Sequence, residues 1–345
     1  MSSKDVISVL VIDDSAHNRR TLSTMLESEP DVRVVDRAAD GEEGLKKVVD
    51  LKPDVVTLDL EMPKLGGYTF LRLLMRTAPT PVIVISSYSH RSDVFKALEL
   101  GAFDFIAKPQ HPTFDAMEAL RVELLEKVRA ARHVRPGYRH AAPGARAMTV
   151  AGEPPLVVAV GASTGGPPAV QRVLEGLAVE PTPCVLVCQH MPPQFTRAFA
   201  DRLDRIGPFT VTEARDGDLV EPGHVYIAPG GRHLVVAERG SRLELHTPPS
   251  TPVDKYAPSV DRLFASMAQV LGAKALGVVL TGMGADGAEG AREVHRAGGE
   301  VWAQSEETSV VFGMPGEAIA TGAVKRVIPL GDIGPALAAL ARRRR

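Results

Sequence analysis

The sequence has 345 residues, of which 44% are hydrophobic and 24% are charged, a composition typical of soluble globular proteins and a length that suggests two domains. Its 40 basic and 42 acidic residues nearly cancel, which excludes a general attraction to nucleic acid or to membrane surfaces. The apolar run near the N-terminus is too short for a signal peptide or a membrane span, so we expect a cytoplasmic protein without membrane insertion.

The first part of the chain alternates short apolar runs with segments of helical pattern. Strands are predicted at residues 6–12, 32–35, 55–58, 82–85 and 103–106, and helices at residues 16–28, 41–50, 68–75, 92–100 and about 113–132. Five strands that alternate with helices predict a doubly wound α/β domain with a parallel sheet. In such a domain the functional groups gather at the carboxyl ends of the strands.

Charged and polar residues follow these predicted strands. Asp13 and Asp14 follow the first strand, Asp59 the third, Ser86 the fourth and Lys108 the fifth. Three carboxylates at one edge would repel one another without a cation, and oxygen ligands favour magnesium or a similar hard ion. Lys108 and the Ser86 hydroxyl are placed to bind the oxygens of a phosphoryl group at Asp59.

Four motifs in this region resemble those of response-regulator receiver domains. They are Val-Ile-Asp-Asp-Ser at 11–15, Leu-Asp-Leu-Glu-Met-Pro at 58–63, Ile-Ser-Ser at 85–87 and Ala-Lys-Pro at 107–109. The resemblance implies a flavodoxin-like receiver domain, which we place at residues 1–127. It also implies that Asp59 accepts phosphate from a histidine kinase, that Asp13 and Asp14 complete the magnesium site, that Ser86 is the switch hydroxyl and that Lys108 is the invariant lysine.

Residues 128–154 lose the apolar period and are rich in Arg, Ala, Pro, Gly and His. This composition predicts a flexible basic linker. Its arginines could contact an acidic partner or domain face, although a solvated linker is the simpler interpretation. The four arginines at 342–345 are interpreted as a solvated tail.

A second alternating region follows the linker, and we place a second domain at residues 155–345. Strands are predicted at residues 156–160, 184–188, 210–213, 224–227, 234–238, 276–280 and 300–303, and helices near residues 169–177, 195–205, 259–271, 285–297 and 314–321. The pattern predicts another doubly wound α/β domain with a mainly parallel sheet and a hairpin-like insertion between about residues 210 and 245.

Three strand ends in this region carry a serine, a histidine and an aspartate. Ser163 lies in a glycine-rich turn between a strand and a helix, where free N–H groups can bind an oxyanion, although such a turn alone more often caps a helix. His190 and Asp286 follow two other strands. Together these residues provide a nucleophile, a base and an orienting acid. Thr164 remains an alternative nucleophile, and the absence of a lysine after the glycines argues against a nucleotide-binding P-loop.

This region resembles the catalytic domain of the chemotaxis protein-glutamate methylesterases, the CheB family, over about residues 155–335. The shared motifs are Gly-Ala-Ser-Thr-Gly-Gly-Pro at 161–167, Gln-His-Met-Pro-Pro at 189–193, Ala-Pro-Gly at 228–230, Pro-Ser-Val-Asp at 258–261, Leu-Thr-Gly-Met-Gly-Ala-Asp-Gly at 280–287 and Val-Phe-Gly-Met-Pro at 311–315. The resemblance implies that Ser163, rather than Thr164, is the nucleophile, with His190 as general base and Asp286 as orienting acid.

The same resemblance implies a function. We expect an enzyme that removes methyl groups from glutamate methyl esters of chemoreceptors, releases methanol and deamidates receptor glutamines, with phosphorylation of the receiver uncovering the site. Backbone N–H groups at Thr164 and Met283 are the oxyanion-hole candidates. The expected partners are methyl-accepting receptors and a histidine kinase, the esterase domain needs no cofactor, and the protein is expected to be a monomer.

Two other functions remain open at this point. A phosphorylation-controlled binding module would need no catalytic residues, and the presence of all three residue types argues against it. A generic serine esterase would hydrolyse small esters without any receptor.

Overall fold

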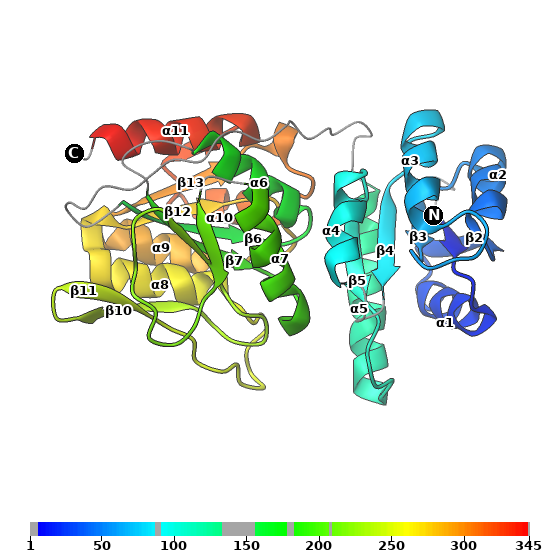
Figure 1. Ribbon diagram of the computed structural model, residues 1–345, viewed down its shortest axis with the longest axis horizontal. Helices are drawn as coiled ribbons and strands as arrows, with labels where there is room; N and C mark the ends of the chain where they lie inside the picture. Colours follow the sequence, from blue (N-terminus) through cyan, green and yellow to red (C-terminus); the bar gives the residue numbers. More distant parts are fainter. Residues whose placement is uncertain (1–5, 87–90, 133–155, 178–182, 207–208, 344–345) are drawn as a thin grey trace. The chain divides into compact units, whose positions relative to one another are not determined.

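The computed structural model describes residues 6–86, 91–132, 156–177, 183–206 and 209–343. The chain divides into two compact units, Met1–Arg139 and His140–Arg345, and each unit contains a parallel sheet with helices (Figure 1). The predicted fold class of two doubly wound α/β domains is confirmed. Within the described ranges, no helix is long and apolar enough to cross a membrane.

The first unit contains a five-stranded sheet in the order β2-β1-β3-β4-β5, with every neighbouring pair parallel. This is the flavodoxin-like order. The strands are β1 (Ile7–Ile12), β2 (Val32–Ala38), β3 (Val55–Leu58), β4 (Val82–Ser86) and β5 (Asp104–Ala107). The helices are α1 (Ala16–Leu26), α2 (Gly41–Leu51), α3 (Gly67–Thr77), α4 (Arg91–Glu99) and α5 (Phe114–Ala131).

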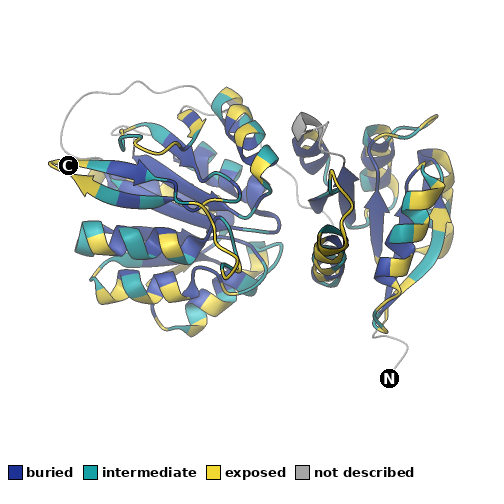
Figure 2. Cartoon of the chain, turned by 90° about the horizontal axis from the view of Figure 1, so that it is seen from below, coloured by how far each residue is buried: buried dark blue, intermediate teal, exposed yellow. Residues whose placement is uncertain are grey.

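Local sequence signals account for these elements. All residues of β3 and β4 are buried, because helices cover both faces of a parallel sheet. Figure 2 shows the strands in dark blue between helices whose outer faces are yellow. Asp40 is the N-cap of helix α2, and its carboxylate accepts hydrogen bonds from the backbone N–H groups of Glu42 and Glu43 at 3.1 and 2.9 Å.

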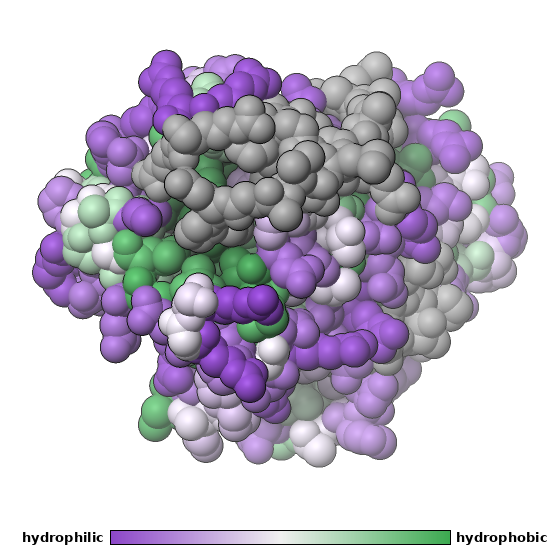
Figure 3. Space-filling model, turned by 60° about the vertical axis from the view of Figure 1, so that its left-hand side comes forward, coloured by the Kyte–Doolittle hydropathy of each residue, from purple (hydrophilic) through white to green (hydrophobic). Residues whose placement is uncertain are grey.

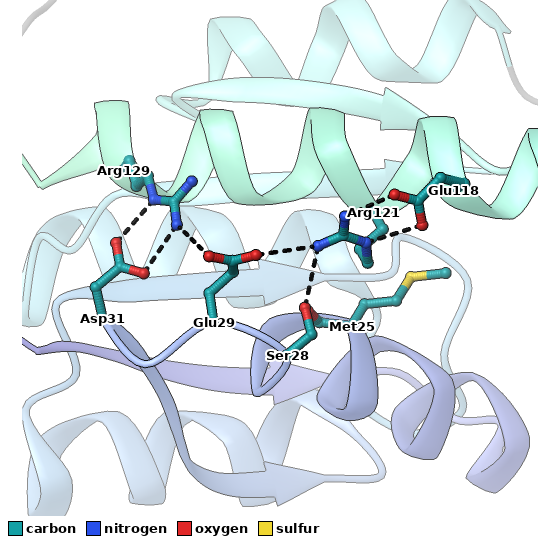
Figure 4. Close-up of polar contacts among 7 residues, drawn as sticks. All are labelled: Met25, Ser28, Glu29, Asp31, Glu118, Arg121 and Arg129. Carbon is teal, nitrogen blue, oxygen red and sulfur yellow. Dashed lines mark hydrogen bonds and ion pairs between the residues drawn. The ribbon is translucent and has the colours of Figure 1, made fainter.

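Helix α5 is joined to the loop between α1 and β2 by a network of charged side chains (Figure 4). Arg129 donates two hydrogen bonds to Asp31, at 2.7 and 2.8 Å, and contacts Glu29 at 3.3 Å. Arg121 donates to Ser28 at 3.2 Å and pairs with Glu29 at 3.4 Å. The hydrogen bond from Arg129 lowers the pKa of Asp31. The network therefore holds the second half of α5 against the loop between α1 and β2.

The linker predicted at residues 128–154 begins inside α5, which continues to Ala131. Residues 133–155, which make up most of this predicted linker, lie outside the described residues.

The second unit contains a seven-stranded parallel sheet in the order β14-β13-β12-β6-β7-β9-β8 and a separate antiparallel pair, β10-β11. The strands are β6 (Val157–Ala162), β7 (Cys184–Gln189), β8 (Thr210–Glu213), β9 (His224–Ile227), β10 (Val235–Arg239), β11 (Arg242–His246), β12 (Leu276–Val279), β13 (Glu300–Gln304) and β14 (Arg326–Ile328). The helices are α6 (Gly166–Gly176), α7 (Pro193–Ile206), α8 (Val260–Leu271), α9 (Ala288–Arg296), α10 (Gly313–Ala320) and α11 (Leu330–Arg343), with short 3-10 turns η2 (Gly272–Lys274) and η3 (Glu306–Thr308).

The core of this unit has one layer on each side of the sheet. Val157 and Ala159 of β6 belong to a buried cluster with Phe264 of α8. Because side chains alternate along a strand, the buried Val158 and Val160 face the opposite layer, where α6 and α11 pack together (Figure 1). In Figure 3, the surface outside the grey atoms is mostly hydrophilic, and apolar residues gather in a smaller region.

One prediction for this unit was wrong in extent. The hairpin-like insertion predicted between residues 210 and 245 is confined to β10 and β11, whereas β8 and β9 extend the main sheet in parallel. Apolar and polar residues alternate in β8, as they do in a hairpin strand. Here the alternation arises because β8 is the edge strand of the main sheet and is only partly buried.

The C-terminal elements were not predicted. Strand β14 is short and two of its three residues are exposed, so its apolar pattern is weak. Helix α11 contains Pro335 and two glycines, which obscure a helical pattern, yet it buries Ile333 and Leu337. Arg342 and Arg343, interpreted as part of a solvated tail, are exposed to solvent but form the end of α11. Residues 344–345 lie outside the described residues.

We predict that Arg129→Ala lowers the free energy of unfolding of the first unit by roughly 0.5–1 kcal/mol, because the pair with Asp31 is bidentate but partly exposed to solvent. Since the pKa of Asp31 is lowered in the folded protein, this contribution is present above the unfolded pKa and is lost as the pH falls through the folded pKa. Urea unfolding followed by circular dichroism measures the loss. Arg20→Ala, an exposed helical arginine, is the matched control, and an equal loss in both variants would contradict the prediction.

Candidate functional site

Three adjacent strands in the middle of the second sheet bring the predicted triad residues to one edge. Ser163 directly follows β6, His190 directly follows β7, and Asp286 lies in the loop between β12 and α9. The strand order places β12, β6 and β7 side by side, all parallel. The carboxyl ends of these strands therefore meet, and the three side chains lie at the same edge.

The histidine and the aspartate are in direct contact. His190 Nε2 lies 2.7 Å from an oxygen of Asp286, whose residue is only 3% exposed. The same carboxylate accepts hydrogen bonds from the Ser259 hydroxyl at 3.0 Å and from the backbone N–H groups of Val260 and Asp261 at 2.7 and 3.0 Å. These groups form the start of α8, where the helix dipole favours a negative charge.

The surroundings of Asp286 keep it ionised. Burial alone would raise the pKa of this carboxyl, but the hydrogen bond and charge of His190, together with the N–H donors of α8, outweigh it, so that the pKa lies below the ordinary value. An ionised Asp286 accepts from His190 Nε2–H, which leaves Nδ1 as the ring nitrogen that can take a proton.

The turn that carries Ser163 is attached to both neighbouring strands. On one side, the Gln189 amide donates hydrogen bonds to the carbonyl oxygens of Ser163 and His190 at 2.8 and 3.0 Å. On the other side, the Ser163 N–H donates to the Thr281 carbonyl at 3.1 Å, and the Thr281 hydroxyl donates to the Thr164 carbonyl at 3.0 Å. The serine backbone is therefore positioned relative to the strands that carry the histidine and the aspartate.

The turn also requires glycine at position 165. Gly165 has a φ of 72°, in the left-handed region that favours glycine, and a Cβ there would lie 2.7 Å from Val310. Helix α6 begins at the next residue. Both the sharp turn and the close approach of the 310–313 segment depend on the absence of a side chain.

Two predicted groups of the site, the Ser163 hydroxyl and the oxyanion-hole N–H groups, are characterised by which hydrogen-bond partners they have within the described residues. No hydrogen bond joins the Ser163 hydroxyl to His190 in the part of the chain that the structure describes. Such bonds often form with good geometry only when substrate is bound. The backbone N–H groups of Thr164 and Met283 have no protein acceptor within the same ranges, which is what an oxyanion hole requires.

In the first unit, the predicted receiver residues also lie at one sheet edge. Asp13, Asp14 and Asp59 offer carboxylate oxygens that lie within 4.8 Å of one another, and this all-oxygen set fits a hard divalent cation. Lys108 Nζ contacts Asp59 and lies 3.0 Å from Asp13, while its backbone N–H donates to the Ser86 carbonyl at 2.8 Å.

The buried pair in this site combines opposing effects. Burial raises the pKa of Asp59, and the charge of Lys108 acts against it. For Lys108, burial would lower the pKa, but the charges of Asp59 and Asp13 outweigh it and raise the pKa. The lysine therefore remains charged beside the carboxylate that would carry a phosphoryl group.

Several residues that support the catalytic edge lie in the family motifs but were given no role from the sequence. Gln189 and Thr281 act on backbone carbonyls of other strands, a role that has no local signal. Ser259 and Asp261 did carry a signal, because a serine followed by an acidic residue before an amphipathic helix is typical of a helix start. In the first unit, Asn18 donates to the Asp13 carboxylate at 3.2 Å and was likewise missed.

The fold and these arrangements indicate a class of protein: an α/β domain with a serine, a histidine and an aspartate at one sheet edge, carried in the same chain as a domain with the carboxylates and lysine of a response-regulator receiver. The family model described as CheB methylesterase matches residues 158–337, and the response regulator receiver domain model matches residues 9–118. The chain belongs to the CheB methylesterase family.

Comparison with individual proteins gives the same result. The chain is 97% identical over 345 residues to "Protein-glutamate methylesterase/protein-glutamine glutaminase 1" of Myxococcus xanthus (strain DK1622), with 100% of both chains covered. It is 47% identical to the protein-glutamate methylesterase/protein-glutamine glutaminase 3 of Geobacter sulfurreducens, with 94% of each chain covered. The crystal structure of the Thermotoga maritima CheB methylesterase catalytic domain has a TM-score of 0.51 and 38% identity, and covers 54% of this chain and 98% of that one.

We predict that Gly282→Ala displaces Ser163 and lowers ester hydrolysis on the order of 100-fold, because misplacing a reacting group by about 1 Å has this effect. A Cβ at Gly282 would lie 2.3 Å from Met314 Sδ and 2.8 Å from Ser163 Cβ. Gly331→Ala is the matched control, since the nearest atom to its Cβ would be 3.9 Å away. Equal activity of the two variants in the same assay would show that Gly282 does not position the serine.

Proposed function

We propose that this protein hydrolyses glutamate methyl esters of chemoreceptors and deamidates receptor glutamines, with Ser163 as nucleophile, His190 as general base and Asp286 as orienting acid. One observation supports this most strongly: three adjacent parallel strands carry these residues to one edge, where His190 lies 2.7 Å from a buried Asp286. The names of the full-length relatives describe both activities.

In the proposed reaction, Ser163 Oγ attacks the side-chain carbonyl carbon of the methyl ester while His190 Nδ1 takes the serine proton. Asp286 stabilises the resulting imidazolium. The tetrahedral intermediate then expels the methoxy group, which takes the proton from His190 and leaves as methanol. Water attacks the acyl-enzyme with His190 again as base, and free glutamate and Ser163 are regenerated. With a glutamine side chain the same steps release ammonia.

The candidate oxyanion hole consists of the backbone N–H groups of Thr164 and Met283. Thr164 follows the nucleophile, and Met283 follows Gly282, which packs directly against Ser163. The two donors therefore come from the loops after β6 and β12, which both adjoin Ser163, and they would stabilise the negative charge that develops on the carbonyl oxygen.

The first unit is proposed to control this activity. Asp59 would accept a phosphoryl group from a histidine kinase, and Lys108 and Ser86 would bind its oxygens. Asp13, Asp14 and Asp59 would hold Mg²⁺, which neutralises negative charge during phosphoryl transfer. The convergence of the three carboxylates and Lys108 supports this assignment.

The domain assignment of a receiver at 1–127, a linker at 128–154 and a methylesterase domain at 155–345 is part of the same proposal. It is supported by the two family matches and by the division into two compact units. We further propose that the protein works in the cytoplasm as a monomer, with methyl-accepting receptors as substrates and the kinase of the same pathway as phosphodonor.

We predict that Ser163→Ala abolishes methanol release from methylated receptor membranes, because the proposed acyl-enzyme forms on the Ser163 hydroxyl. Thr164→Val keeps the backbone N–H group and the shape of the side chain, so it should retain activity within about threefold, as expected when only an uninvolved hydroxyl is lost. The reverse pattern would make Thr164 the nucleophile. Retained turnover in Ser163→Ala would remove the proposed mechanism. Absence of methanol release by the native protein would favour the binding-module alternative.

We predict that Asp59→Asn prevents activation by a small phosphodonor, because the amide cannot be phosphorylated, whereas the exposed Asp50→Asn responds as the native protein does. Deletion of residues 1–150 should raise basal methanol release if the receiver restrains the site. The measurement is methanol release with and without phosphodonor. Equal activity of the deletion variant and the unphosphorylated full-length protein would argue against restraint.

A further inference from the structure

The loop between β11 and α8 places an aromatic ring against the proposed catalytic base. Tyr256 in this loop stacks on the His190 imidazole, with ring centroids 4.5 Å apart and ring planes 7° apart. Tyr256 is half-buried, and the His190 side chain is 14% exposed. The tyrosine ring therefore covers one face of the imidazole.

The loop that carries Tyr256 is fixed by a charged residue two positions earlier. Asp254 accepts hydrogen bonds from the backbone N–H and the hydroxyl of Thr251, both at 2.7 Å. It also pairs with Arg262 of α8 at 2.5 Å. The loop is thus attached to the helix whose first residues bind Asp286, so that the aromatic ring and the orienting acid share one support.

The far end of Tyr256 reaches the loop after β12. A Cβ at Gly284 would lie 2.4 Å from the Tyr256 hydroxyl oxygen, so the hydroxyl occupies the space that a side chain at that position would need. Gly284 has a φ of 83°, which also favours glycine. Tyr256 therefore spans from His190 to the residue after Met283.

A restraint of this kind has a consequence for the base. The hydrogen bond to Asp286 fixes one nitrogen of His190 but leaves the tilt of the ring plane free to vary. Parallel aromatic stacking restricts this tilt and thereby the direction of the Nδ1 lone pair. The face of a tyrosine ring also attracts a cation, and His190 becomes a cation when it takes the serine proton.

We propose that Tyr256 is a positioning residue for His190: its ring holds the imidazole plane toward Ser163 and stabilises the imidazolium formed during attack. The proposal rests on the role of His190 proposed above. Lys255 Nζ also lies 5.1 Å from the centroid of this ring, so part of its attraction for cations is already used. We therefore expect positioning to be the larger contribution.

The test compares Tyr256→Phe, Tyr256→Leu and Tyr256→Met in the full-length protein, with kcat and KM measured by methanol release from methylated receptor membranes. Phe keeps the ring and should retain kcat within about threefold, whereas Leu and Met should lower kcat about tenfold and change KM less than about twofold. Val253→Ala in the same loop, at a position that is 90% exposed, should match the native protein. Unfolding midpoints of all variants show whether each one is folded.

Three results would overturn the inference. In the first, the Tyr256→Leu and Tyr256→Met variants retain the native kcat. In the second, these variants change only KM. In the third, Tyr256→Phe loses as much kcat as Tyr256→Leu, which would assign the effect to the hydroxyl contact at Gly284. Ser163→Ala and His190→Gln in the same assay separate the two proposals. If these two variants remain active, the proposed catalytic roles of Ser163 and His190 fail; if they are inactive while Tyr256→Leu is native-like, only the role of Tyr256 fails.

Discussion

The buried negative charge of Asp286 is the constraint on which the catalytic unit depends. A carboxylate removed from water is strongly unfavourable unless donors surround it. Here the first residues of α8 provide the Ser259 hydroxyl and two backbone N–H groups, and the remaining contact goes to His190. The start of α8 thus fixes Asp286, and Asp286 orients the His190 imidazole. Tyr256, in the loop before α8, stacks on the same imidazole and restrains its ring plane.

The two units place their functional side chains in the same part of the fold but differ in the charges that they bring together. In both, a parallel sheet collects side chains at the carboxyl ends of its strands. The receiver unit brings three carboxylates together and balances them with Lys108, so that a cation and an incoming anion both find partners. The catalytic unit places the Asp286 carboxylate at a helix start in contact with the His190 imidazole, and Ser163 follows the neighbouring strand, an arrangement that suits proton transfer.

Much of this arrangement was predictable because strand ends can be read from apolar periodicity. Ser163, His190 and Asp286 each follow such a run, and parallel topology brings those ends to one edge. Gln189 and Thr281 could not be predicted, because their hydrogen bonds depend on which strands become neighbours, and the order β12-β6-β7 is not a local property. Helix α11 was missed for a different reason: Pro335 and two glycines interrupt its pattern, and its packing against α6 determines its structure.

A carboxylate near the start of each of the helices α8 and α9 accepts hydrogen bonds from the start of the other helix. Asp286, just before α9, binds the first N–H groups of α8, while Asp261 in the first turn of α8 accepts from the N–H groups of Gly287 and Gly290 at 2.8 and 2.7 Å. Each helix start uses a carboxylate from the segment that carries the other, so the two helix starts stabilise one another. Since Asp286 is held by the start of α8 while it contacts His190, a chain in which this pairing is lost has no oriented base. Enzyme activity is therefore also a sensitive reporter of native structure in this half of the protein.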